Sequence, residues 1–435
     1  MNPKLRPIEV RSIEDRGRPA LLLRDPLMLS EKVAVVPQVL GPLLALMDGS
    51  RDAAGLHAAL LIRTGLRVSP EIIQHLIDQL DDALLLENEH FAQAYAETLR
   101  AYRAASFRPP SLAGTGYPAD ATRLRGLLDD YVAKVSVNGT GADVSLFNVA
   151  AGGSELPGLA TGAASQGDIV GLISPHIDYM RGGPIYAGVW ERAADAVRAA
   201  DLVIIFGTDH TGSAGRVTLT RQNYATPYGV LPTDRALVDA IADAIGQESA
   251  FGEEIHHRGE HSIELAAVWL HHMRHGQPCQ VVPILCGSFQ HFVSGQADPA
   301  SDHVLDATLR VLREAMSGRR TLIVAAADLA HVGPAFNDPF PIDHVRYAQL
   351  GAADEILIQT LTDPDPGAFF RQIAAEGDRR NICGLPPIYL TLRLLEGKAR
   401  GELTGYDRCP ADTQRTSFVS VCGVVFRRQP GTPGW

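Results

Sequence analysis

Short segments that carry histidine, aspartate or cysteine follow apolar runs at several places in this sequence. The first of them contains His176 and Asp178 and follows the apolar run Ile169–Ile173. A short apolar run that ends at Gly or Pro, as this one does at Pro175, indicates a buried strand. In open α/β sheets, ligands bind beyond the carboxyl ends of the strands. His176 is therefore expected where such a sheet would bind a ligand.

Four further segments combine residues of these types with glycine: Gly207–Thr211, Gly259–Glu264, Asp328–Gly333 and Asn381–Gly384. Their chemically active residues are Asp209, His210, Glu260, His261, Asp328, His331 and Cys383. Two of the segments follow strand-like runs, so neighbouring parallel strands would bring their histidines and Asp328 into one cleft with His176. One histidine at a strand end is more often a hydrogen-bonded packing residue than a ligand. Three strand ends with both His and Asp, and a Cys in a Gly-bounded turn, indicate a metal site or an acid–base site.

The elements that must position these residues alternate between strands and helices. The predicted strands are Ile169–Ile173, Leu202–Phe206, Val281–Leu285, Leu322–Ala326 and Ser417–Phe426. The predicted helices are Val189–Ala200, Asp234–Ile245, Ile263–His272, Ala307–Met316, Asp343–Thr360 and Pro387–Leu395. This alternation predicts an α/β fold with a central, largely parallel sheet flanked by helices. The segment Gly139–Gly167 is rich in Gly, Ala and Ser and is expected to be a flexible insertion.

Residues 1–95 are predicted to form a small α+β winged-helix domain, followed by a helical linker (residues 96–107) and by the α/β domain (residues 108–430). Pro70 after Ser69 predicts the start of a helix, and Leu84–Leu86 predicts a strand or wing after it. The order of elements over Arg18–Phe91 resembles the PqqD-like family, which are winged-helix modules that bind peptides. The alternative is a generic winged helix used for dimerisation or docking.

Composition limits the classes of function. The 435 residues are 46% hydrophobic and 20% charged, with a net charge of −11. An acidic chain without a polybasic tract is not expected to bind nucleic acid. No apolar segment approaches the ~20 residues of a membrane-spanning helix, and no signal peptide is expected. Five widely spaced cysteines without a CxxC pair favour a reducing cytoplasm.

These five segments, in the order in which they occur, resemble those of the Memo family, the B component of the AmmeMemoRadiSam system. The family's motifs are Ser-Pro-His-Ala-Gly-Tyr, Gly-Pro-x-His, Glu-His-Ser-Ile-Glu, Ser-Asp-x-x-His and Ile-Cys-Gly. This chain has similar residues, in the same order, at Ser174–Tyr179, Gly207–His210, Glu260–Glu264, Ala327–His331 and Ile382–Gly384. Because Arg108–Pro118 also resembles the start of the family's domain, the resemblance covers about Arg108 to Phe426.

The resemblance implies the fold of class III extradiol dioxygenases, which hold a non-haem iron with two histidines and one carboxylate. In Memo proteins a cysteine stands in place of that carboxylate, so the implied metal ligands are His176, His210 and Cys383. Imidazole suits iron, copper and zinc, whereas thiolate favours softer or redox-active metals. Three protein ligands leave coordination positions open for a substrate. The alternative for Cys383 is a small buried hydrophobic residue.

The function implied by the resemblance is a metal-dependent redox or dioxygenase-like activity on a small molecule or peptide. The metal would be iron (Fe²⁺) or alternatively copper, with zinc less favoured. The residues expected to move protons are His331, Asp328 and His261. The chain departs from the family pattern at Asp178 and Asp209. These two carboxylates and Glu260 are expected to orient the ligands or to replace one of them.

Two alternative functions fit the same residues. The chain would be a non-catalytic adaptor or ligand-binding partner of a radical-SAM enzyme in peptide or protein modification, or it would be a zinc hydrolase, which the thiolate disfavours. His271 and His272 are expected at the surface, because adjacent residues do not share a helix face. His256 and His257 are expected in a solvated loop.

Overall fold

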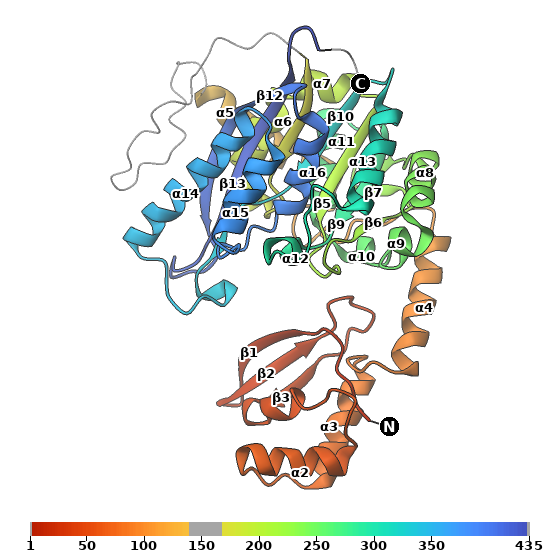
Figure 1. Cartoon of the computed structure of the whole chain (residues 1–435), viewed down its shortest axis with the longest axis vertical. Coiled ribbons are helices and arrows are strands. Elements are labelled where there is room, and N and C mark those ends of the chain that lie inside the picture. Colours follow the sequence, from red (N-terminus) through yellow and green to blue (C-terminus); the bar gives the residue numbers. More distant parts are fainter. Residues whose placement is uncertain (1, 139–167, 433–435) are drawn as a thin grey trace. The chain divides into compact units, whose positions relative to one another are not determined.

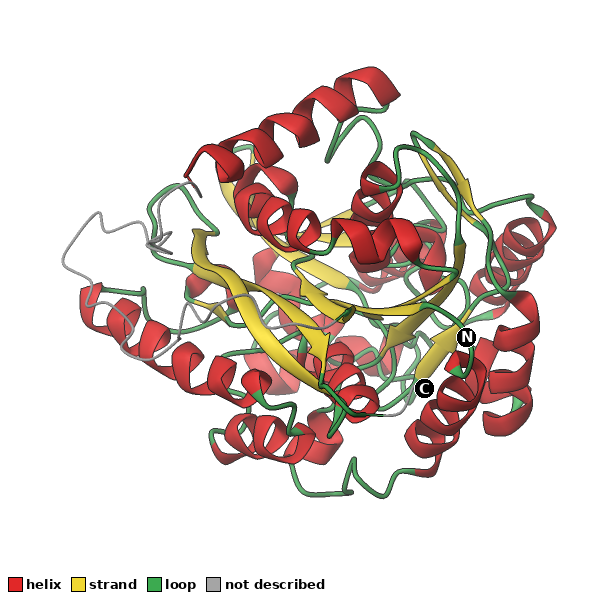
Figure 2. Ribbon diagram, turned by 90° about the horizontal axis from the view of Figure 1, so that it is seen from above, coloured by secondary structure: helices red, strands yellow, loops and turns green. Residues whose placement is uncertain are grey.

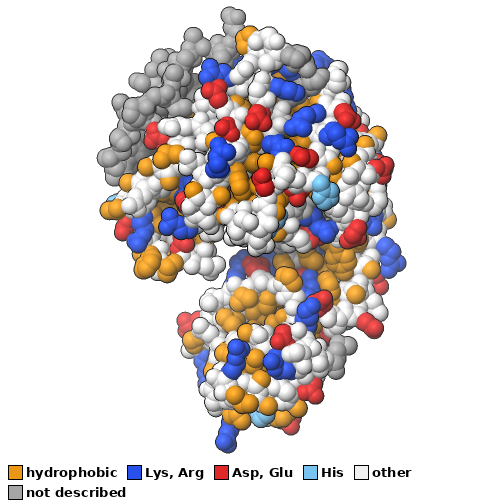
Figure 3. Space-filling model, viewed as in Figure 1, with side chains coloured by type: hydrophobic (Ala, Val, Ile, Leu, Met, Phe, Trp, Pro, Cys, Tyr) orange, Lys and Arg blue, Asp and Glu red, His pale blue; other side chains and the backbone are white. Residues whose placement is uncertain are grey.

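The computed structural model of this chain describes residues 2–138 and 168–432 (Figure 1). The chain divides into two compact units, Met1–Ala105 and Ser106–Trp435. Most of the predicted insertion Gly139–Gly167 lies outside the described residues. Within the described residues, no helix is both long and apolar enough to cross a bilayer. On the face shown in Figure 3, acidic and basic side chains are interspersed over both units.

The N-terminal unit is a three-stranded antiparallel sheet followed by helices. Its strands are β1 (Glu9–Asp15), β2 (Arg18–Arg24) and β3 (Ala34–Pro37), and its helices are η1 (Gln38–Leu40), α1 (Gly41–Leu44), α2 (Ala53–Thr64), α3 (Pro70–Asp82) and α4 (Glu89–Ala104). Pro70 occupies the first turn of α3, as predicted. The strand predicted at Leu84–Leu86 is wrong. Leu84 has a left-handed backbone (φ 59°), and Leu86 makes a single β-bridge with Leu5, because these leucines turn into the core.

The C-terminal unit contains one mixed sheet of eight strands with helices on both faces (Figures 1 and 2). Its strands are β4 (Ile169–Ser174), β5 (Leu202–Thr208), β6 (Val217–Leu219), β9 (Gln280–Cys286), β10 (Thr321–Ala326), β11 (His331–Val332), β12 (Ala399–Pro410) and β13 (Phe418–Arg428), and β7 (Tyr224–Thr226) and β8 (Gly229–Leu231) form a separate hairpin. Along the sheet the order is β11-β13-β4-β10-β5-β9-β6, and β12 pairs with β13. The four central strands are parallel, which confirms the predicted α/β fold.

The helices of this unit are α5 (Ala121–Asn138), α6 (Tyr179–Arg192), α7 (Ala194–Ala199), α8 (Arg235–Ile245), α9 (Gln247–Phe251), α10 (His256–Gly259), α11 (Ser262–Met273), α12 (Gln290–Val293), α13 (His303–Met316), η2 (Pro334–Phe336), α14 (His344–Thr362), α15 (Pro366–Ala375) and α16 (Leu385–Leu395). They cover the sheet in two layers. Every residue of β5 is buried, and its side chains alternate between the two layers. Ile204 belongs to the buried apolar cluster that includes residues of α8, α13 and α16, whereas Ile205 belongs to the cluster that includes residues of α6 and α11. A strand buried on both faces reads as a continuous apolar run, which explains why its position was predictable.

The helix predicted at Val189–Ala200 differs from the structure, because α6 begins at Tyr179, directly after Asp178. Its first turns contain Gly182 and Gly183, and glycine in a sequence usually indicates a turn or a loop rather than a helix. Here a Cβ at Gly182 would lie 2.5 Å from Ile177 Cγ2, and one at Gly183 would lie 2.4 Å from the ring of Tyr131. The two glycines therefore permit close packing inside a helix.

Candidate metal centre

The carboxyl ends of three adjacent parallel strands form the base of the site. β10 lies between β4 and β5, and Ala326 is in register with Ser174 on one side and Gly207 on the other. The residues that follow each strand therefore emerge side by side: His176 after β4, Asp328 after β10, and His210 after β5. The convergence expected from the sequence is present in the structure.

His176 is held by atoms of the neighbouring strand end. Its side chain is 2% exposed, and its Nδ1 donates to the carbonyl oxygen of Ala326 at 3.0 Å. Its Nε2 lies 3.3 Å from Cys383 Sγ. The carboxylate of Asp328 accepts from the backbone N–H of His176 at 2.8 Å and from that of Ile177 at 3.2 Å. Asp328 thereby fixes the turn that presents the imidazole.

Glu260 holds two histidines at once. One of its oxygens accepts from the backbone N–H of His210 at 3.1 Å and from His210 Nδ1 at 3.0 Å. Its other oxygen lies 3.1 Å from His261 Nδ1 and accepts from the N–H groups of His261 and Ser262. The rings of His210 and His261 stack with their centroids 4.9 Å apart. Because Nδ1 of each ring is engaged, both imidazoles present Nε2.

Cys383 reaches the site from the loop before α16. Its carbonyl oxygen accepts from Thr208 Oγ1 at 3.0 Å, and the N–H of Gly384 donates to the carbonyl oxygen of Asp328 at 3.1 Å. A Cβ at position 384 would lie 2.2 Å from that carbonyl oxygen, so only glycine permits this approach. The close contact of Gly384 with Asp328 thus places the Cys383 thiol next to the ends of the strands.

One nitrogen of His176, one nitrogen of His210 and Sγ of Cys383 lie within 4.8 Å of one another. Such a set of donors fits a metal ion that prefers nitrogen and sulfur. The three side chains differ in exposure, since His176 is buried, Cys383 is half-buried and His210 is exposed. The donor group therefore opens toward solvent on the side of His210, where a substrate can approach.

The electrostatics of the group favour a thiolate. Burial opposes ionisation of Cys383, but the nearby imidazoles of His176 and His331 outweigh it and hold the pKa of this thiol well below its usual range. Burial would lower the pKa of His176, but Asp328 and Cys383 raise it to about 9. Burial likewise opposes the charge on Glu260, yet His210 and His261 hold its pKa well below its usual range. A metal cation can replace the protons that these ion pairs hold.

Comparison with known proteins identifies the family. The model of the family described as "Memo-like protein" matches residues 108–425. The chain belongs to the Memo family.

Curated relatives agree with this assignment. A MEMO1 family protein of Aquifex aeolicus is 24% identical over 431 residues, which cover 98% of this chain and 100% of the relative. MEMO1 family proteins of Methanococcoides burtonii (28% over 262 residues, 60% of this chain and 87% of the relative) and Archaeoglobus fulgidus (24% over 321 residues, 74% and 99%) are also similar. The five motif segments all lie inside the Memo match. The Aquifex alignment also includes most of the N-terminal unit, which lies outside that match.

The three side chains His176, His210 and Cys383 are called the Memo centre below. Of the other predicted site residues, His261 and His331 lie close to this centre, whereas Asp178 does not. The His261 ring lies edge-on to His176 at 5.6 Å. His331 Nδ1 donates to the carbonyl oxygen of Leu329 at 3.2 Å, and His331 contributes to the lowered pKa of Cys383. Asp178 instead accepts from the N–H of Arg181 at the start of α6 and forms an ion pair with its guanidinium at 2.6 Å. It belongs to none of the donor groups found among the described residues.

Two pairs of histidines were predicted wrongly. His256 and His257 lie in α10 rather than in a solvated loop, and His257 is fully buried between Tyr224 and the carbonyl of Thr218. Burial lowers the pKa of His257 to about 3. His271 and His272 are buried too, because all of α11 is covered and no face of it is left to solvent. The prediction assumed that α11 has a face exposed to solvent. Because every residue of α11 is buried, adjacent residues on different faces are both covered.

A buried ion pair that sequence reasoning missed supports Glu260. Arg108 and Glu264 form an ion pair at 2.5 Å and are at most 1% exposed. Arg108 donates to the carbonyl oxygens of His257 (2.6 Å) and Glu260 (2.8 Å). Glu264 also accepts from Ser111 N, Leu112 N and Tyr117 OH. The first segment of the Memo domain is thereby tied to the turn that carries Glu260.

Proposed function

We propose that this Memo protein holds one redox-capable metal ion, iron or alternatively copper, with His176, His210 and Cys383. The observation that carries the proposal is the convergence of two imidazole nitrogens and the Cys383 sulfur within 4.8 Å at the ends of parallel strands. Two nitrogen donors and one sulfur donor suit iron or copper better than they suit magnesium or calcium. When bound, such an ion supplies a Lewis acid and an electron donor or acceptor.

The protein's own groups prepare this site in three ways. Glu260 fixes the tautomer and the orientation of His210, and Asp328 fixes the turn that carries His176. Three protein ligands leave positions open for a small-molecule or peptide substrate. His261 and His331 each have Nδ1 held by an oxygen acceptor, so each presents Nε2 for accepting or donating a proton at the substrate. We propose a redox reaction of the dioxygenase-like class on this basis.

The test is to purify the full chain without oxygen and to measure metal content and metal-dependent O₂ consumption. We expect near-stoichiometric iron or copper in the wild type and loss of both signals in Cys383→Ser. Cys409→Ser is the matched control, because Cys409 is buried and belongs to none of the donor groups among the described residues. Equal metal in wild type and Cys383→Ser would remove the thiolate from the ligand set. No metal in the wild type after reconstitution would overturn the metal-centred function.

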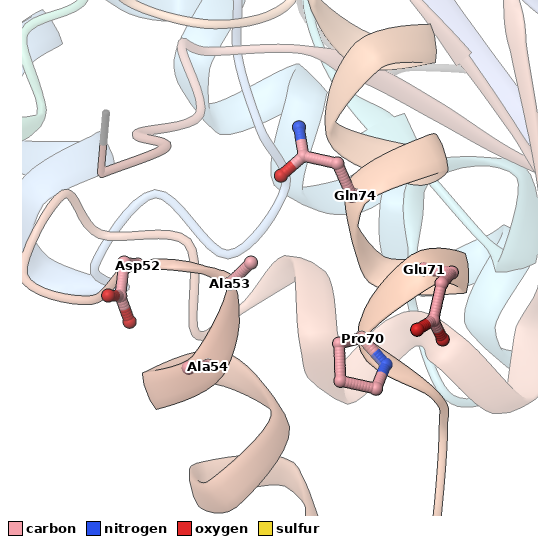
Figure 4. Close-up of a pocket in the computed structure, with 6 residues that line it drawn as sticks. All are labelled: Asp52, Ala53, Ala54, Pro70, Glu71 and Gln74. Atoms are coloured by element: carbon pink, nitrogen blue, oxygen red, sulfur yellow. The ribbon is translucent and has the colours of Figure 1, made fainter.

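The N-terminal unit supports a second proposed function, namely docking of a peptide or of a radical-SAM enzyme. Its sheet order β1-β2-β3 leaves β1 and β3 as edges, with Val10 51% and Val35 41% exposed. An exposed edge strand is a template for an added strand. The starts of α2 and α3 also line a pocket that contains the carboxylates of Asp52 and Glu71 (Figure 4). Carboxylates there favour a cationic group.

This second function predicts a complex that depends on the sheet edge. We expect the full chain to co-elute with a radical-SAM enzyme from the same genome in size-exclusion chromatography. Charged substitutions Val10→Asp and Val35→Asp would weaken the complex, whereas Ile62→Asp on the exposed face of α2 would not. Co-elution of all variants alike, or of none including the wild type, would contradict docking at this edge.

A further inference from the structure

A further group of side chains of metal-ligand type consists of Asp209, Glu253 and His256, of which Asp209 lies next to His210 in the sequence. Asp209 follows β5, Glu253 follows α9, and His256 begins α10. One donor atom from each of them lies within 4.8 Å of the other two. His256 Nδ1 is 2.9 and 3.1 Å from the two oxygens of Asp209 and 4.0 Å from Glu253 Oε2.

Burial separates this group from an ordinary acidic surface patch. The side chains of Asp209, His256 and Glu253 are 1%, 9% and 18% exposed. Charged groups withdrawn from water to this degree need a compensating charge. An imidazole donor is also present, and imidazole is a common ligand of first-row transition metals.

The backbone makes room for the buried carboxylate. A Cβ at Gly212 would lie 2.5 Å from Asp209 Oδ2, so the turn after β5 closes over that oxygen only because residue 212 is glycine. Asp209 also accepts from Thr211 N at 3.2 Å. These contacts fix the carboxylate where it faces His256.

The charges of the group leave it negative when His256 is neutral. Glu253 accepts from Ser213 N at 3.0 Å, which is a neutral donor, and its cationic neighbour is Arg216 with Nε at 3.8 Å. Two carboxylates beside one guanidinium leave a net negative charge. A bound dication would offset it, and so would a proton on His256, which is the competing arrangement.

We propose that Asp209, Glu253 and His256 form a second cation site, which binds a divalent transition metal such as Mn²⁺ or Fe²⁺. Two carboxylates and one imidazole are harder donors than the thiolate set of the first site. The two sites would be joined by consecutive residues, Asp209 and His210. The inference goes beyond the proposed function, because it holds whichever metal His176, His210 and Cys383 bind.

The test uses Mn²⁺, because it prefers hard oxygen ligands such as carboxylates to thiolate. The metal-free full chain is titrated with Mn²⁺, and unbound Mn²⁺ is measured by electron paramagnetic resonance. We expect one saturable equivalent in the wild type that is retained in Cys383→Ser. Asp209→Asn, Glu253→Gln and His256→Asn should each weaken it at least ~10-fold, since loss of a ligand costs no less than loss of an orienting group.

Asp178→Asn is the matched control, since Asp178 also follows a strand end but pairs with Arg181. Its Mn²⁺ affinity should equal that of the wild type. Circular dichroism of each variant checks folding, and Glu253→Gln, the least buried of the three, preserves side-chain volume. A wild type without saturable Mn²⁺ binding below ~1 mM, the weak end of protein cation sites, would overturn the proposal. Equal affinity in the wild type and in folded Asp209→Asn or Glu253→Gln would overturn it as well and would leave the His256–Asp209 pair as an ion pair.

Discussion

At the scale of single residues, Glu260 is the group on which the orientation of the Memo centre depends. It is buried and it accepts from both His210 and His261. Glu260 is not one of the three proposed ligands His176, His210 and Cys383, although its carboxylate also lies within 4.8 Å of donor nitrogens of His210 and His261. A carboxylate that accepts a hydrogen bond from Nδ1–H fixes the orientation of the imidazole ring and raises the basicity of Nε2.

We therefore predict that Glu260→Gln lowers metal affinity about 10- to 100-fold while the chain remains folded. Competition with a chelator, followed by metal analysis, measures this affinity. Asp178→Asn serves as the control, because Asp178 contacts Arg181 rather than a proposed ligand. Unchanged affinity in Glu260→Gln would show that His210 does not depend on this carboxylate.

The metal-free protein should have a pH-dependent stability that arises from His176. Its pKa is raised to about 9 in the folded chain, chiefly by Asp328 and Cys383 acting against burial, compared with about 6.5 in the unfolded chain. A group with a raised folded pKa contributes stability that is complete below the unfolded value and is lost as the pH rises through the folded value. Cys383 remains a thiolate over this range because its pKa is held low.

Without metal, the wild type should have a higher free energy of unfolding than His176→Asn. We expect this difference to be larger at pH 7 than at pH 10. Denaturant unfolding at the two pH values gives the comparison. A difference between the two proteins that does not change with pH would show that His176 is neutral in the metal-free site.

At the scale of elements, the loop before α16 is positioned by close backbone contact rather than by side chains. Gly384 lies against the carbonyl oxygen of Asp328, and this contact sets where Cys383 enters the site. The same contact joins α16 to the end of β10. An added methyl group must push the loop and the strand end apart.

We predict that Gly384→Ala destabilises the protein by about 1–3 kcal/mol and lowers its metal content. Gly126→Ala on α5 is the control, because a Cβ there meets nothing within 4 Å. That substitution should leave metal content unchanged and stabilise the helix by up to ~1 kcal/mol. Equal unfolding midpoints for Gly384→Ala and the wild type would show that the loop relaxes without cost.

At the scale of the whole molecule, features that depend on residues close together in the sequence were predictable, and features that depend on residues far apart in the sequence were not. The strand ends with His176 and His210 were predictable, because buried strands have local apolar runs and local stop signals. The burial of His257 and His271 was not, since it depends on elements far along the chain that cover them.

The same reasoning explains what was missed at the site. The ion pair of Arg108 with Glu264 joins two segments that are far apart in the sequence. Hydrophobic periodicity describes single elements and therefore could not predict this contact. The contact between Asp209 and His256 is likewise long-range. Helix α6 was misplaced because its glycines serve packing, which is a property of the neighbours rather than of the helix.

X-ray absorption of the anaerobic, iron-reconstituted full chain tests the metal centre most directly. For the wild type we predict one sulfur neighbour at about 2.3 Å from the metal, the usual metal–thiolate distance, together with imidazole nitrogens. Cys383→Ser reconstituted in the same way should hold too little iron to give a sulfur neighbour or the wild-type imidazole nitrogens. A wild-type spectrum with nitrogen and oxygen neighbours and no sulfur would contradict the proposal that His176, His210 and Cys383 hold the metal.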